Sequence, residues 1–204
     1  MGCDIHLYVE YRKTIKDKPK WYSGDYLMLN PYYDVYDDEE SVYTIVPLYD
    51  DRNYDLFAIL ADVRNYCDNK YISLPKGLPK DVTKETAKES FYWGDDGHSH
   101  SYFTLRELLE FTPEVIHRKG YISKEAADEL DAGVMPTSWC RYTNAEDYVY
   151  REWVENSNEL EPLIKLLKQR AHELGVVYNW EWKYEPEKAL EKSENIRIVF
   201  WFDN

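Results

Sequence analysis

The stretch "MGCDIHLYVEY", residues 1–11, decides how the fold begins. From residue 3 onward, apolar side chains alternate with polar ones. The first set is Cys3, Ile5, Leu7, Val9 and Tyr11, and the second is Asp4, His6, Tyr8 and Glu10. A period of two is typical of a half-buried β-strand. The stretch therefore predicts a strand with one face toward a core and one polar face.

The C-terminal part of the chain predicts further strands. In "IRIVFWF", residues 196–202, Ile196, Ile198, Phe200 and Phe202 alternate with Arg197, Val199 and Trp201, and "VVYNWEWKY", residues 176–184, is rich in β-branched and aromatic residues. With "EPEKALEKSEN" between them, these stretches predict a hairpin with a long loop. Strands at both ends and helices between them predict an α+β fold. We expect a single domain over residues 1–204, with a mainly antiparallel sheet that contains both terminal strands.

Helical periodicity occurs between the terminal strands. Apolar residues recur at helical spacing or follow capping residues in the ranges 53–65, 83–93, 105–111, 124–132 and 158–174. Thr104 and Glu107 have the spacing of a capping box, and Ser123 is placed to cap the next helix. The segment "DDGHSHS", residues 95–101, is expected to be a polar loop.

The composition restricts the classes of partner. The 25 basic and 39 acidic side chains give a net charge of -14, and no run of Lys or Arg forms a basic stripe. Such a chain repels nucleic acid and anionic membranes, so neither is an expected direct partner. No apolar run approaches the length of about 20 residues that spans a membrane, and the start does not have the pattern of a signal peptide. Three scattered cysteines do not form a disulfide framework, so we expect a reducing compartment.

Two segments carry candidate metal ligands. On the predicted strand, Asp4 and His6 point the same way and are placed to bind one divalent ion, or one orients the other, whereas Glu10 lies too far away. In "WGDDGHSHS", residues 93–101, the candidate ligands are Asp96, His98 and His100, and Ser99 offers a hydroxyl to a phosphate. Both segments also have plainer interpretations: a solvent-facing strand surface and a connector that caps the following helix.

A third segment offers groups for a phosphate. Arg52 and Asn53 stand where a helix is expected to begin, and helix N-termini attract anions. Arg52 adds a guanidinium that binds a phosphate with two hydrogen bonds, or else it pairs with a neighbouring Asp. Trp93 is placed to stack on a nucleotide base or to pack in the core.

Several of these stretches together resemble a known group of proteins. "MGCDIH", "RNYDLFAILADVRN", "GLPKDV", "WGDDGHSHS" with "TLREL", and "RIVFWFDN" are similar to an uncharacterised family encoded by bacteriophages and prophages. The resemblance covers most of residues 1–109 and the last strand, but not 110–194. It implies expression in the cytoplasm of a host cell. It also favours one convergent site that contains Asp4, His6, Arg52, Asn53, His98 and Ser99.

A second similarity concerns the candidate metal ligands. Asp-x-His near the start and Gly-His-x-His later are similar to the first and last motifs of calcineurin-like metallophosphoesterases, which would match Asp4, His6, His98 and His100. The chain departs from that family between these motifs, because it contains neither Gly-Asp-x-x-Asp nor Gly-Asn-His.

Three functions remain open from the sequence. The first is a metal-dependent hydrolase of a phosphoester or nucleotide, with Asp4, His6 and His98 as catalytic residues, acting against host defence signalling. The second is a non-catalytic sponge that captures a nucleotide through Arg52, Ser99 and Trp93. The third is an acidic protein that mimics DNA and blocks a DNA-binding host factor, with a host defence protein as the candidate partner.

Overall fold

The computed structural model describes residues 2–31, 33, 42–111, 115–156 and 158–203. Its contacts divide the chain into two compact units. Unit 1 consists of Met1–Asn53, Ser73–Phe111 and Leu160–Asn204, and unit 2 of Tyr54–Ile72 and Thr112–Glu159. The α+β class is confirmed. The single domain over residues 1–204 stays a prediction.

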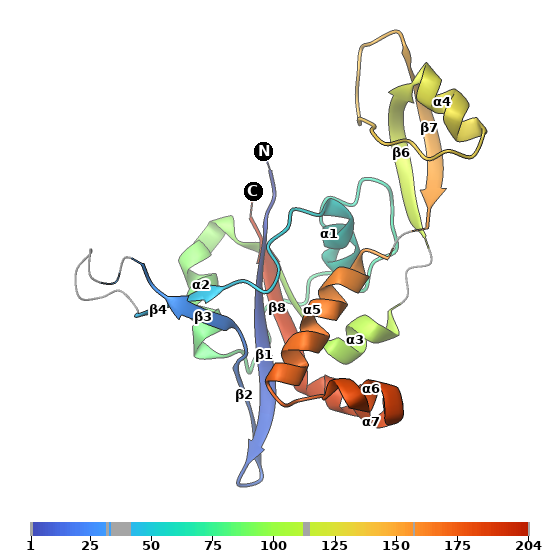
Figure 1. The fold of residues 1–204 in the computed structure, drawn as a ribbon. Helices are drawn as coiled ribbons and strands as arrows, with labels where there is room; N and C mark the ends of the chain where they lie inside the picture. The colour runs from blue at the N-terminus through green and yellow to red at the C-terminus, as the bar shows by residue number, and fades with distance from the viewer. Residues whose placement is uncertain (1, 32, 34–41, 112–114, 157, 204) are drawn as a thin grey trace. The chain divides into compact units, whose positions relative to one another are not determined.

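Unit 1 is built on a four-stranded antiparallel sheet in the order β2-β1-β8-β5 (Figure 1). The strands are β1 (Ile5–Ile15), β2 (Lys18–Ser23), β5 (His98–Thr104) and β8 (Ile196–Phe202). The first and last strands of the chain are neighbours, with Val9 opposite Ile198, and the prediction that one sheet contains both is confirmed. Every residue of β8 is buried, because helices cover both faces of the strand.

Different helices cover the two faces of this sheet (Figure 1). Helix α2 (Lys84–Trp93) lies on the face of His6, where its Trp93 ring contacts the imidazole. The other face is covered by α3 (Leu105–Glu110), α5 (Leu160–Glu173), α6 (Asn179–Tyr184) and α7 (Pro186–Lys192). The capping box of Thr104 with Glu107 begins α3, as predicted. Unit 1 also contains the hairpin of β3 (Tyr26–Leu29) and β4 (Tyr43–Val46) and the short helices η1 (Gly94–Asp96) and η2 (Ser193–Asn195).

Two predictions of local structure are wrong. The range 176–184 was expected to be a strand, but it contains α6, which ends the hairpin interpretation. Glu181 is buried, accepts a hydrogen bond from the backbone of Tyr178 and pairs with Lys192, so these polar contacts fix the helix. The segment 95–101 was expected to be a loop, but from His98 onward it forms β5 along β8.

Unit 2 combines a two-stranded sheet with two helices. Its elements are α1 (Tyr54–Ala61), β6 (Ile116–Ser123), α4 (Lys124–Asp131) and β7 (Tyr148–Glu155). Ile122, Ala127 and Trp153 form a small core between β6, β7 and α4. Ser123 caps α4 as predicted.

A buried carboxyl group joins β1 to the turn between β2 and β3. Asp25 is 7% exposed, and its Oδ1 accepts a hydrogen bond from the backbone N–H of Val9 at 2.7 Å. Ser23 Oγ donates to the second oxygen at 3.2 Å. Burial raises the pKa of Asp25 to about 7. The folded protein therefore holds a proton on this residue at weakly acidic pH.

This proton makes a testable contribution to stability. An unfolded Asp releases its proton near pH 3.9, roughly, whereas folded Asp25 keeps it up to about pH 7. Between these pH values the folded state binds more protons than the unfolded state. The contribution of Asp25 to the free energy of unfolding therefore falls as the pH rises through this window. Asp25→Asn keeps an acceptor for Val9 and removes the titration. We therefore expect urea unfolding to show the variant gaining stability relative to wild type as the pH rises. The exposed Asp17→Asn should show no such trend, and a parallel trend in both variants would contradict the assignment.

Candidate functional site

A pocket of about 400 Å³ lies in unit 1 beside the first residues of β1. The ends of β1 and β8, the last turns of α2 and residues 44–50 line it. Its polar and aromatic lining residues are Asp4, His6, Tyr8, Thr44, Asp50, Glu89, Trp93 and Asp203. The fold thus brings three of the predicted site residues, Asp4, His6 and Trp93, to one place.

His6 is anchored in the wall of this pocket. Its Nε2 lies 3.2 Å from Asp203 Oδ2, and its ring centroid lies 3.9 Å from that of Trp93. Asp203 is fixed in turn, because its Oδ1 accepts a hydrogen bond from the backbone N–H of Asp4 at 2.9 Å. The side chains of His6 and Asp203 are each 19% exposed. The imidazole is therefore held in orientation by a carboxylate but remains accessible.

Arg52 reaches the same place from the segment before α1. Its Nε and Nη2 donate to the two carboxylate oxygens of Asp4 at 2.7 and 2.6 Å. These hydrogen bonds hold the pKa of Asp4 below its usual value. A Cβ at Gly2 would lie 2.6 Å from Arg52 Nη1, so the glycine leaves room for the guanidinium. Arg52 thus pairs with an Asp, as one interpretation of the sequence suggested, and Asp4 is such a partner. Asn53 is half-buried and does not line the pocket.

A row of rings continues from His6 across the sheet. Trp201 is fully buried, and its ring stacks on Tyr8 at 4.9 Å and on His100 at 5.3 Å. Ser90 Oγ lies 2.9 Å from His100 Nε2. Burial and the nearby His98 lower the pKa of His100, which favours its neutral form at neutral pH. His100 is therefore a packed, hydrogen-bonded residue beneath α2.

His98 does not join His6. His98 is opposite Phe202 in the sheet, with ring centroids 6.1 Å apart, whereas His6 is opposite Trp201. Consecutive residues of a strand point to opposite faces, so the two histidines lie on opposite faces of the sheet. A bulge after His98 causes this, with Ser99 at a φ of 55° and its hydroxyl 3.0 Å from His98 Nδ1. The expected meeting of His6, His98 and Ser99 around one ligand is therefore wrong.

The predicted set of metal ligands is also dispersed. Asp96 is exposed on η1, His98 lies on the other face, and Asp4 is occupied by Arg52. Within the described ranges, no group of three or more His, Cys, Asp or Glu side chains is placed to hold a metal ion. A divalent metal stays a proposal.

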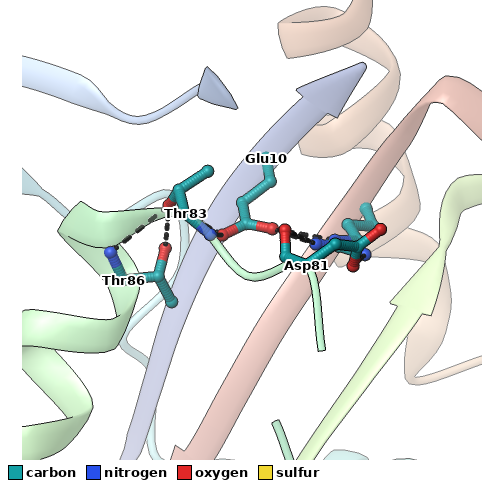
Figure 2. A network of polar contacts seen from close by, with 5 residues as sticks. Glu10, Asp81, Thr83 and Thr86 are labelled. Atoms are coloured by element: carbon teal, nitrogen blue, oxygen red, sulfur yellow. Dashed lines mark hydrogen bonds and ion pairs between the residues drawn. The ribbon is translucent and has the colours of Figure 1, made fainter. Parts of the chain in front are cut away.

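Farther along the same face lies an ion-pair network in which Glu10 and Arg197 are buried and Asp81 is exposed (Figure 2). Arg197 Nη2 lies 2.6 Å from Glu10 Oε2, and Arg197 Nη1 lies 2.8 Å from Asp81 Oδ1. The second oxygen of Glu10 accepts hydrogen bonds from the backbone N–H and the hydroxyl of Thr83, each at 2.8 Å. Thr83 also caps α2, with its hydroxyl accepting from the backbone N–H of Thr86. The network therefore fixes the start of α2 on the sheet, and the last turn of the same helix carries Trp93.

Sequence reasoning missed three of the pocket residues. Asp203 follows β8 and has the same position in the alternation as Arg197 and Trp201. The pattern therefore indicates the face on which it lies, but it does not indicate that His6 is its partner. Asp50 and Glu89 come from a loop and a helix surface, and no spacing linked them to His6.

The pocket is rich in acidic groups. Asp4, Asp50, Glu89 and Asp203 line it, and Arg52 is the cationic side chain bound at its edge. Carboxylates at this density repel a bare anion and attract cations. A phosphate would therefore enter more readily with a divalent ion. The anchored imidazole suits the transfer of a proton to or from a bound molecule.

Comparison of the chain with protein-family models, with curated proteins and with solved structures finds no significant match. In the part of the chain that the structure describes, no helix has the length and apolar character needed to cross a membrane.

Proposed function

We propose that the pocket binds a small phosphoester or nucleotide together with a divalent cation and hydrolyses it. The observation that carries the proposal is the hydrogen bond from His6 to Asp203 inside a pocket with four carboxylates. His6 is the general base, Asp203 is its positioning residue, and Arg52 and Trp93 bind the ligand.

The pairing of His6 with Asp203 supports proton transfer. When Nε2–H donates to the carboxylate, Nδ1 is left as an acceptor that can take a proton from water. A histidine in this arrangement supplies base catalysis near neutral pH. The ring contact with Trp93 limits the imidazole to one orientation.

The acidic lining supports a cation that arrives with the ligand. Mg²⁺ commonly uses one or two protein carboxylates and completes its shell with water and substrate phosphates. Such a site needs only one or two protein ligands. The lack of a group of three ligands among the described residues is therefore compatible with it. Asp50 and Asp203 line the pocket and are the expected ligands, whereas Asp4 is already paired with Arg52. Arg52 can exchange the exposed Asp4 carboxylate for a phosphate, since both accept two parallel hydrogen bonds.

The proposal is tested by incubating the purified chain with ribonucleotides, cyclic dinucleotides and bis(p-nitrophenyl) phosphate. Each substrate is supplied with MgCl₂ or MnCl₂, and the products are identified by mass spectrometry. We expect cleavage of at least one substrate class, and we expect excess EDTA to abolish it. An absence of cleavage in every condition contradicts the hydrolase.

One observation favours a second function, a non-catalytic nucleotide sponge. Trp93 lines the pocket beside His6, with the two ring centroids 3.9 Å apart, so it offers an aromatic ring on which a nucleotide base can stack. In that case the protein retains a nucleotide, and heating releases it intact. Recovery of fragments excludes the sponge in favour of hydrolysis.

A further inference from the structure

The hairpin of β1 and β2 extends beyond the rest of the sheet in unit 1 (Figure 1). The pairing of β1 with β8 ends at Tyr11, whereas its pairing with β2 continues to the turn at residues 16–17. All residues from 13 to 20 are exposed. The outer side of β2 has no neighbouring strand in the described sheet, because the strand order is β2-β1-β8-β5. The hairpin therefore presents an open sheet edge.

A groove of about 510 Å³ lies beside this edge, a volume within the range of binding sites. It is lined by residues 19–23 of β2, by residues 81–85 at the start of α2 and by Arg12. Since residues 19–23 follow one another in a strand, about 16 Å of β2 borders the groove. The groove is therefore long enough to hold an extended segment of similar length.

Pro19 indicates which backbone groups of β2 point away from β1. Proline has no N–H to donate to the neighbouring strand, so the pair of Pro19 with Thr14 is one without ladder hydrogen bonds. Such pairs alternate along an antiparallel ladder, so the N–H and C=O of Trp21, two residues on, also point outward. Trp21 lines the groove as well. The edge thus offers a backbone donor and acceptors to one more strand.

The same hairpin gathers cationic side chains in a chain with a net charge of -14. Lys13 and Lys20 lie directly opposite each other across the two strands, and like charges at such positions repel. Within the described ranges, no carboxylate forms an ion pair with any cation of residues 12–20. The hairpin therefore maintains an uncompensated positive patch beside the open edge. Its members are Arg12, Lys13, Lys16, Lys18 and Lys20.

The two carboxylates of the groove leave this patch positive. Asp81 Oδ1 is already paired with Arg197 Nη1 at 2.8 Å. Glu85 is exposed, and the equally exposed Lys84 beside it balances its charge. The groove and the hairpin together therefore favour a ligand of negative charge.

We propose that the groove binds an extended segment of another protein that is rich in Asp and Glu and adds a strand to β2. In this mode of recognition, main-chain hydrogen bonds supply affinity and side chains supply specificity. The specificity here is charge, because carboxylates of the segment reach the lysines of the hairpin. A second copy of this chain is not the occupant, since its own β2 carries the same lysines. The inference is independent of the function proposed for the His6 pocket, because the two sites share no lining residue.

Isothermal titration calorimetry of the full chain with a short acidic peptide tests the site. The probe is an acetylated and amidated peptide of four Glu alternating with three Val, and we expect saturable one-site binding. The same peptide with Lys in place of Glu should not bind. A version with N-methyl groups on every peptide nitrogen keeps its charge but cannot donate to β2, so it should bind at least about tenfold more weakly.

Two double variants separate the patch from the total charge. Lys18→Glu with Lys20→Glu should weaken binding of the acidic peptide about tenfold, the effect of losing two exposed ion pairs. Lys165→Glu with Lys183→Glu, at exposed positions of α5 and α6, changes the net charge equally and should keep the wild-type affinity. Circular dichroism should show both variants folded.

A spectroscopic readout locates the peptide at the edge of β2. In ¹H–¹⁵N spectra, the amide resonance of Trp21 should move downfield and exchange more slowly when the acidic peptide binds, because its N–H gains an acceptor. The proposal would be overturned by no saturable binding, by equal binding of the N-methylated peptide, or by unchanged affinity in Lys18→Glu with Lys20→Glu. Tighter binding of a single-stranded oligothymidylate than of the peptide would overturn it too.

Discussion

Arg197→Met is expected to lower the free energy of unfolding by about 3–5 kcal/mol, the usual cost of removing one partner of a buried ion pair. The side chain of Arg197 is 4% exposed and that of Glu10 is fully buried. Without the guanidinium, the Glu10 carboxylate keeps its bonds to Thr83 but loses its cation. Arg197 also lies 3.9 Å from the Trp21 ring centroid, so the loss includes a cation–π contact.

A matched control separates this effect from the loss of any arginine. Arg106 forms ion pairs with Glu110 and Glu194, but its side chain is 36% exposed. Exposed pairs contribute at most about 1 kcal/mol, so Arg106→Met should change stability little. Denaturant unfolding of both variants measures the difference. Equal losses in the two variants would show that the network in Figure 2 does not hold α2 on the sheet.

A double substitution tests why the single one is costly. When both charges are replaced by apolar groups of similar volume, no uncompensated charge remains in the interior. We therefore expect Glu10→Leu with Arg197→Met to recover part of the stability that Arg197→Met loses. A double variant less stable than the single one would mean that the contacts of Glu10 to Thr83 matter more than the charge of Arg197.

Two strands of the sheet in unit 1, β1 and β8, were predictable because their apolar pattern is local. Strand β1 alternates apolar and polar residues, and β8 is a short apolar run that contains one polar residue, Arg197, as is typical of a strand buried on both faces. The helices with capping residues were predictable for a similar reason, since Thr104 and Ser123 satisfy backbone groups within a few residues. These signals need no knowledge of distant contacts.

The wrong predictions concern segments whose secondary structure is determined by contacts with residues far away in the sequence. The range 176–184 has the composition of a strand, yet Lys192 and the buried Glu181 stabilise a helix there. The polar segment after Gly97 becomes a strand because buried β8 offers it hydrogen-bonding partners. Local propensity is easily overridden in such tertiary contexts. The hairpin of β6 and β7 in unit 2 was not predicted from the sequence at all.

The site was predicted in part for the same reason. The shared face of Asp4 and His6 follows from alternation within one strand. In a regular strand His98 and His100 would share a face, but the bulge at Ser99 puts His98 opposite Phe202 and leaves His100 on Trp201. This one-residue bulge depends on a positive φ at Ser99. Serine does not favour a positive φ, so the sequence does not indicate the bulge.

His6→Ala is expected to reduce kcat/KM for the substrate that the hydrolysis screen identifies by about 10²–10⁴-fold, the usual contribution of a general base. The reason is that His6 is the imidazole in the pocket and Asp203 holds it at 3.2 Å. Asp203→Asn leaves the base in place but weakens the contact that orients it. It should therefore lower kcat/KM less than His6→Ala does.

The most direct test of the account is this comparison of kcat/KM, with the exposed His117 of unit 2 as the control position. We expect His6→Ala to lose turnover and His117→Ala to keep the wild-type rate, with circular dichroism showing that both variants are folded. Wild-type turnover in a folded His6→Ala variant would contradict it, because the anchored imidazole beside β1 would then have no part in the chemistry.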